Sequence, residues 1–221
     1  SDGVLLVPMR DFTGKLWNVQ RIAAEPPLSG GPDKLFQRGG RKSGLWHMIG
    51  DSTRASVLLV AEGYATASSV HEATNRPTAC AFDAGNLAHV TKALHQAHPT
   101  ALIVICGDDD TGTQKRTGHN PGRDQATAAA RSVRGLAVFP EPLPPGGSDF
   151  NDLHQANGLD AVRACIEVVI DAHQGNQAPV GSNRERMFDP FTVDHTGVWF
   201  CGVDQDGKRK PPEWLCSRLA V

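Results

Sequence analysis

The sequence has no long apolar run and no closely spaced pair of cysteines. None of its apolar stretches approaches the roughly 20 residues that a membrane-spanning helix needs, so we expect no membrane anchor. The five cysteines, Cys80, Cys106, Cys165, Cys201 and Cys216, are widely separated. This spacing excludes a Cys-x-x-Cys pair that holds zinc or exchanges disulfides. We expect reduced, mostly buried thiols and a cytoplasmic location.

The sequence also has little net charge. The net charge of −2 at pH 7 gives no global attraction to nucleic acid, so any such binding must come from a local basic patch. The first residues contain neither a secretory signal nor an initiating Met, and we expect the natural termini to lie outside this chain. A length of 221 residues with 39% apolar residues predicts one main globular domain with flanking pieces.

Apolar runs and turn residues divide the chain into parts. We predict a small basic β-rich subdomain at 1–56, the main α/β domain at 57–175, a polar linker at 176–186 and the start of a further, truncated β-rich domain at 187–221. Within the first part, residues 4–22 predict two strands joined by a turn at 11–14. Within the last, residues 191–207 predict a hairpin.

The main domain alternates apolar strands with helical periods. We predict strands at 57–61, 78–82, 101–106 and 136–139, and helices at 66–74, 87–98, 124–133 and 159–173. Strands without polar alternation are typical of a parallel sheet that is covered on both faces. The order βαβαβαβ therefore predicts an α/β fold with a parallel four-stranded sheet and helices on both faces.

Carboxylates follow two of these strands directly. The first strand runs into Glu62, and the third runs through Gly107 into Asp108, Asp109 and Asp110. In a parallel sheet the ligand crevice lies beyond the carboxyl ends of the strands. Carboxylates gathered there repel one another unless a cation neutralises them, and hard oxygen ligands suit Mg²⁺. The pattern predicts Mg²⁺, or Mn²⁺, held by Asp108 and Asp110.

A third acidic pair, Asp149 and Asp152, follows the fourth strand. Either Asp149 or Asp152 can complete the metal site from a neighbouring strand end, with Asp149 as the candidate ligand, or either can act as an N-cap or loop acid in the segment that follows. The sequence leaves both interpretations open.

The combination of these three acidic segments resembles a known fold. Glu-Gly at 62–63, Asp-x-Asp at 108–110 and Ser-Asp-Phe-Asn-Asp-Leu at 148–153 are similar to the Toprim fold of bacterial-type primases, topoisomerases and some nucleases. The resemblance implies that Glu62 acts as general acid/base and that Asp108 and Asp110 hold the metal. Ser148 departs from the pattern, because many primases have a basic residue there.

The flanking segments resemble one branch of this family. Residues 7–22 and 34–44 look like the segment before Toprim in plasmid and phage primases, and the chain from Phe188 onward is similar to a domain that precedes the helicase module in mobile-element primase-helicases. The zinc-binding module that often precedes a primase core is not found in the sequence.

The resemblance implies a DNA primase that serves replication of a mobile element. Such an enzyme makes short primers from nucleoside triphosphates on a single-stranded DNA template, with a helicase domain or subunit as a further partner. Glu62 would accept the proton of the attacking hydroxyl or hold a second ion. A metal-dependent Toprim nuclease and a non-catalytic Toprim module that binds nucleic acid are the alternatives. A topoisomerase is disfavoured, because Tyr64 is the only tyrosine and lies two residues after Glu62.

Basic side chains flank the predicted acidic edge and are candidates for binding nucleotide and nucleic-acid phosphates. They are Arg21, Lys34, Arg38, Arg41 and Lys42 before the sheet, and Lys115, Arg116 and Arg123 after the Asp cluster. The aromatic residues Trp17, Trp46 and Phe36 can stack on bases, but we expect core packing for each.

Overall fold

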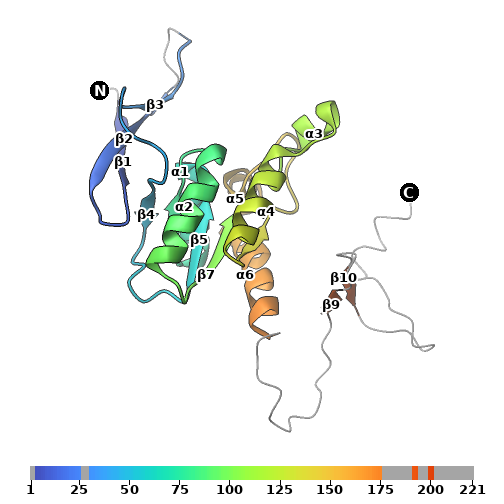
Figure 1. Ribbon diagram of the computed structural model, residues 1–221. Coiled ribbons are helices and arrows are strands. Elements are labelled where there is room, and N and C mark those ends of the chain that lie inside the picture. The colour runs from blue at the N-terminus through green and yellow to red at the C-terminus, as the bar shows by residue number, and fades with distance from the viewer. Residues whose placement is uncertain (1–2, 26–29, 176–190, 194–198, 202–221) are drawn as a thin grey trace, which may run out of the picture. The chain divides into compact units, whose positions relative to one another are not determined.

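The computed structural model of the protein describes residues 3–25 and 30–175, together with two short strands farther along the chain (Figure 1). The chain divides into two compact units, Ser1–Asn176 and Gln177–Val221. In the second unit, β9 (Phe191–Val193) pairs antiparallel with β10 (Trp199–Cys201), as the predicted hairpin requires. The predicted linker at 176–186 and the turn at 204–207 lie outside the described residues.

The first unit opens with a three-stranded antiparallel sheet in the order β1-β2-β3. Its strands are β1 (Val4–Arg10), β2 (Leu16–Ala23) and β3 (Lys34–Phe36). The predicted turn between the first two strands is confirmed. Asp11 accepts a hydrogen bond from the Thr13 amide at 2.9 Å, and Gly14 takes a φ of 79° that favours glycine.

The alternation of side chains across this sheet separates a buried face from an exposed one. Asn18 and Gln20 occupy buried positions of β2. The register between β1 and β2 shifts at Trp17, which has no partner in β1. Trp17 is 38% exposed, and the expectation that it packs in the core is wrong. Trp46 is buried and Phe36 packs against the core, as predicted.

The main sheet has five strands in the order β4-β6-β5-β7-β8. They are β4 (His47–Ile49), β5 (Val57–Ala61), β6 (Thr78–Cys80), β7 (Leu102–Cys106) and β8 (Leu136–Val138). The predicted parallel core is confirmed, because β6, β5, β7 and β8 run parallel. The structure adds β4 as an antiparallel edge strand on β6, a segment that we had assigned wholly to the N-terminal subdomain.

Helices cover both faces of the main sheet, as predicted. They are α1 (Tyr64–Thr74), α2 (Ala84–Ala97), α3 (Thr111–Thr117), α4 (Pro121–Ser132), α5 (Phe150–Asn157) and α6 (Leu159–Gly175). One buried cluster joins the sheet to α1, α5 and α6 through Val70, Leu153 and Ile166. A second cluster joins the sheet to α2 and α4 through Val90 and Ala126. No helix in the described part of the chain is long and apolar enough to cross a membrane.

A buried asparagine joins the N-terminal segment to the main domain. Asn86, at the start of α2, accepts the Gly44 amide at 2.7 Å and donates to the carbonyls of Leu45 and Ala81 at 2.9 and 2.8 Å. Close by, Lys42 Nζ lies 2.6 Å from Asp83 Oδ2. Because an unpaired buried amide is costly, these contacts fix the loop before β4 against the N-terminus of α2.

Candidate active site

Glu62 lies at the carboxyl end of β5, where the chain turns into α1. Burial raises the pKa of its carboxyl group, and the neighbouring carboxylates of Asp83, Asp110 and Asp149 raise it further. The amide of Ala84, at the start of α2, donates to Glu62 and opposes this shift. Glu62 therefore holds its charge at a cost, beside other acids, which is typical of a functional carboxylate.

Asp108 lies at the centre of the acidic edge. It follows β7, and its Oδ1 atom is buried without a hydrogen-bond partner among the described residues. Burial raises the pKa of Asp108 to about 8, and the carboxylates of Glu62, Asp149, Asp110 and Asp152 add to the shift. The structure thus brings together the acidic segments that the sequence predicted would meet at this edge.

Asp110 is held against the N-terminus of α4. Its Oδ2 atom accepts the Gly122 amide at 2.9 Å, and its own amide donates to the side chain of Asn120 at 3.0 Å. Position 122 has no room for a side chain, because a Cβ atom there would lie 2.5 Å from the carbonyl oxygen of Asp108. The helix backbone therefore packs directly on the loop that carries both predicted metal ligands.

Asp109, between the two predicted ligands, serves a different purpose. It is 7% exposed, and its two carboxylate oxygens accept from Asn120 Nδ2 at 2.7 Å and from Arg123 Nη2 at 2.8 Å. The hydrogen bond from Arg123 lowers the pKa of Asp109 the most, and the bond from Asn120 lowers it further. Its amide donates to the Ser148 carbonyl at 2.6 Å. Asp109 therefore anchors the loop to α4 and to the segment before α5.

Asn120 completes this anchor, and we did not identify it from the sequence. Its Oδ1 atom accepts from the amides of Asp110 and Arg123, while Nδ2 donates to Asp109 and, at 3.2 Å, to Gln114 Oε1. The side chain is 6% exposed and has a partner for each polar atom. A signal was present in the sequence, because asparagine followed by proline is typical of a helix N-cap and first helical position. We call Asp109, Asn120 and Arg123 the loop clamp.

Asp149 is the N-cap of α5. Its Oδ1 atom accepts the Asp152 amide at 2.8 Å, and its Oδ2 atom accepts the Thr66 hydroxyl at 2.9 Å. Asp152 reciprocates in a capping box. The structure therefore supports the capping interpretation of Asp149 and also places its charge near Asp108. Its role as a metal ligand stays a prediction.

The residues at this edge fit a divalent cation. The donors are carboxylate oxygens, and the buried Asp108 Oδ1 atom lacks any hydrogen bond from the described residues. Among those residues, no group of three or more His, Cys, Asp or Glu side chains forms a complete metal site. Mg²⁺ is usually bound by one or two carboxylates together with waters and substrate phosphates. Asp108 and Asp110 match the one or two carboxylates expected of such a site.

Two of the predicted basic residues form ion pairs with carboxylates at or beside the acidic edge. Lys42 pairs with Asp83, which adjoins Glu62, and Arg123 pairs with Asp109. Arg21, Lys34, Arg38 and Arg41 lie exposed on the N-terminal sheet and the loop after it, and Lys115 and Arg116 lie exposed on α3. Their roles in binding phosphate stay predictions.

Comparison with known proteins agrees with this geometry. Residues 57–160 match a family model described as the Toprim domain. Two curated relatives, both named DNA primase TraC and both from Escherichia coli, are 41% and 42% identical over 137 residues. These matches cover 61% of this chain but only 9% and 12% of the relatives. The chain thus matches about a tenth of the length of these relatives.

Solved structures with the same fold come from primases. The DnaG primase catalytic domain bound to ssDNA has a TM-score of 0.53 and 18% identity, over 78% of this chain and 56% of that one. The primase fragment of the bacteriophage T7 primase-helicase protein has a TM-score of 0.52 and 17% identity, over 75% and 64%. A DNA primase domain from Pseudomonas aeruginosa has a TM-score of 0.51 and 20% identity, over 80% and 57%. At these identities the likeness establishes the fold.

Proposed function

Because residues 57–160 form a Toprim domain, we propose that this chain is the catalytic part of a DNA primase of a plasmid, phage or other mobile element. The observation that carries the proposal is the group of carboxylates around Asp108, one of whose oxygens is buried without a partner among the described residues. The relatives named as DNA primases support the same activity.

The proposed reaction extends a primer by one nucleotide. The 3′-hydroxyl oxygen bonds to the α-phosphorus of a nucleoside triphosphate, the bond from that phosphorus to the bridging oxygen breaks, and pyrophosphate leaves. A divalent ion, Mg²⁺ or Mn²⁺, held by Asp108 and Asp110 would neutralise phosphate charge and align the reacting groups. Glu62 accepts the proton of the hydroxyl, because its raised pKa brings it closer to the working pH.

The loop clamp contributes by positioning rather than by contact with substrate. Its bonds hold Asp108 and Asp110 in one conformation against like-charge repulsion. We propose single-stranded DNA and nucleoside triphosphates as the substrates. A helicase domain or subunit is the proposed partner, which the likeness to a primase fragment of a primase-helicase supports. The reduced cysteines Cys80, Cys106 and Cys165 are consistent with work in the cytoplasm.

The proposal is tested by nucleotide incorporation on single-stranded DNA with Mg²⁺. We expect short, template-complementary products from the wild type and none from Glu62→Gln or Asp108→Asn. Asp160→Asn is the matched control, because that acid is 97% exposed at the start of α6 and is not among the carboxylates that raise the pKa of Glu62 or Asp108. Undiminished synthesis by folded Glu62→Gln protein would overturn the role of Glu62.

The same assay without nucleotides separates the alternatives. Metal-dependent cleavage of the template that disappears with Glu62→Gln would indicate a Toprim nuclease. Binding of single-stranded DNA that is unchanged by Glu62→Gln, with neither synthesis nor cleavage, would indicate a non-catalytic module.

A further inference from the structure

Trp17 is exposed near the start of β2 in the N-terminal sheet, outside the acidic site. Its strand neighbours Asn18 and Gln20 are buried, and Trp17 itself is 38% exposed. Trp17 packs on neither of the two buried clusters of the described residues, so core packing does not account for its position. The contacts around it give a better account.

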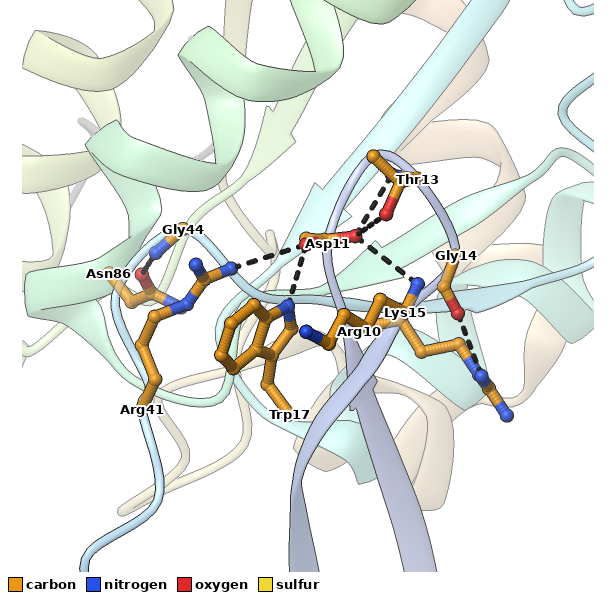
Figure 2. A network of polar contacts seen from close by, with 9 residues as sticks. All are labelled: Arg10, Asp11, Thr13, Gly14, Lys15, Trp17, Arg41, Gly44 and Asn86. Atoms are coloured by element: carbon orange, nitrogen blue, oxygen red, sulfur yellow. Dashed lines mark hydrogen bonds and ion pairs between the residues drawn. The ribbon is translucent and has the colours of Figure 1, made fainter.

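The indole is fixed in place by Asp11 (Figure 2). Trp17 Nε1 donates to Asp11 Oδ2 at 2.6 Å, and Arg41 Nη2 lies 3.7 Å from the same oxygen. The other carboxylate oxygen accepts from the Thr13 hydroxyl and from the amides of Thr13 and Lys15. These hydrogen bonds, of which the one from the Thr13 hydroxyl has the largest effect, lower the pKa of Asp11 to about 2. A charged, fully bonded carboxylate therefore orients an exposed aromatic ring.

Two cations lie against this ring. Lys15 Nζ is 4.0 Å and Arg41 Cζ is 4.3 Å from its centroid, which is cation–π distance. Arg41 is also tied to Asp11, whereas the Lys15 ammonium is carried on an exposed, flexible side chain. A planar base can therefore take the place of the Lys15 ammonium on the indole, and the ammonium then remains beside the phosphate of that nucleotide. We call Asp11, Lys15, Trp17 and Arg41 the Trp17 platform.

The exposed face of the N-terminal sheet near the platform carries a similar mixture of apolar and positive groups. Arg21 lies opposite Leu6 on β1 and opposite Leu35 on β3, and cross-strand partners share one face of a sheet. Leu6 is 59% and Leu35 52% exposed, and Arg21 is exposed between them. Trp17 lies four residues before Arg21 in the same strand, at the point where the register with β1 shifts and leaves Trp17 without a cross-strand partner.

The charge of this region favours a nucleic acid over a protein partner. Residues 1–45 contain seven Lys and Arg against four Asp and Glu, although the whole chain carries a net charge of −2. A protein interface is depleted of charge at its core, whereas Arg21 stands at the centre of this face. Aromatic rings set among cations are typical of surfaces that bind single-stranded nucleic acid by stacking bases and contacting phosphates.

We propose that the Trp17 platform and the adjoining face of Leu6, Arg21 and Leu35 bind single-stranded nucleic acid, with one base stacked on Trp17 in place of the Lys15 ammonium. The inference rests on the proposed function, since it identifies where the template is held. It does not depend on the acidic edge, so binding can be measured without metal.

The test is binding of a fluorescent oligo-dT to the protein in EDTA, followed by anisotropy. Stacking of one base contributes about 1 to 3 kcal/mol, so Trp17→Ala should raise the Kd roughly five- to 150-fold. Trp17→Phe, which keeps a stacking ring, should recover most of the affinity. Val168→Ala is the control, because it also removes an exposed apolar side chain but lies on α6.

Salt and duplex DNA separate stacking from charge. Trp17→Ala should leave the slope of log Kd against log salt unchanged, whereas Arg21→Gln should make it shallower by about one counterion. Blunt duplex of equal length offers no unstacked base within its length, so Trp17→Ala should alter its Kd by less than about twofold. Oligo-dT should also quench tryptophan emission more in the wild type than in Trp17→Phe, and this comparison serves if Trp17→Ala does not fold.

The possible results differ for the two proposals. Equal oligo-dT affinity for wild type and folded Trp17→Ala, or an equal loss in Val168→Ala, overturns the platform. The platform is likewise overturned if the wild type makes primers but oligo-dT gives equal quenching in wild type and Trp17→Phe. Trp17-dependent binding without primer synthesis supports the platform and counts against the proposed function.

Discussion

Replacing Asp108 by asparagine should make the metal-free protein more stable. The carboxylate is largely buried, its Oδ1 atom has no partner among the described residues, and its pKa is raised from 3.8 to about 8 by burial and by its acidic neighbours. Because the folded-state pKa lies above the unfolded value, stability is full below pH 4 and declines as the pH rises through 8. The shift corresponds to a loss on the order of 5 kcal/mol across that interval.

Asparagine keeps the shape of the side chain and removes its charge, although the amide also needs hydrogen bonds in a buried position. We therefore expect only part of this free energy to be recovered, about 1 to 3 kcal/mol at pH 8. In a domain of this size the gain corresponds to a rise in Tm of roughly 2 to 10 °C. The rise should be much smaller at pH 5, where the wild-type carboxyl is protonated.

Thermal unfolding in EDTA and in Mg²⁺, at pH 5 and pH 8, measures this effect. In the wild type, Mg²⁺ should raise the Tm at pH 8, because an ion that binds only the folded state stabilises it. Asp108→Asn should lose that response, and Asp160→Asn should keep it. Two results would contradict this account. If Asp108→Asn is no more stable than the wild type in EDTA at pH 8, the charge of Asp108 does not destabilise the metal-free protein. If the variant still responds fully to Mg²⁺, Asp108 does not bind the ion.

Further variants examine the contacts that hold the site together. Asn120→Ala removes the hydrogen bonds to Asp109 and Asp110. In thermal melts at graded Mg²⁺ concentrations, the concentration that gives half-maximal stabilisation should therefore rise about 10- to 100-fold. An unchanged Mg²⁺ titration would show that Asn120 acts only as the N-cap of α4. Gly122→Ala places a Cβ atom 2.5 Å from the Asp108 carbonyl oxygen, so urea unfolding should show a loss of about 1 to 3 kcal/mol, and a neutral result would mean that the helix can move away. Asn86→Ala leaves buried carbonyls unpaired and should cost about 2 to 4 kcal/mol by the same measurement, with a loss below about 0.5 kcal/mol as the contrary outcome.

The parallel core was predictable because its signal is local. β5 and β7 are unbroken apolar runs that end in acids, and that arrangement indicates both the sheet and the edge where Glu62 and Asp108 meet. β4 has only three residues without a clear period, and it becomes a strand by pairing with β6. α3 has no buried residue and therefore no apolar period to reveal it.

The supporting residues of the site were harder to predict than its acids. Asn120 acts by bonding to Asp109 and Asp110, about ten residues away, across a turn and a short helix that the sequence did not define. The exposure of Trp17 was also hard to predict, because the amide side chains of Asn18 and Gln20, rather than apolar residues, fill buried positions of β2 and the register with β1 shifts at Trp17. Apolarity alone therefore does not indicate which side chains of this strand are buried.

The most direct test of the central claim is anomalous diffraction from crystals soaked with Mn²⁺ and a nucleoside triphosphate. The claim is that Asp108 and Asp110 hold the catalytic metal at the carboxyl edge of the sheet. We predict an anomalous peak within ligand distance of Asp108 Oδ1 and of the Asp110 carboxylate, adjoining the phosphates of the nucleotide and lost in Asp108→Asn crystals. Nucleotide and Mn²⁺ bound elsewhere, with no peak at Asp108, would contradict it.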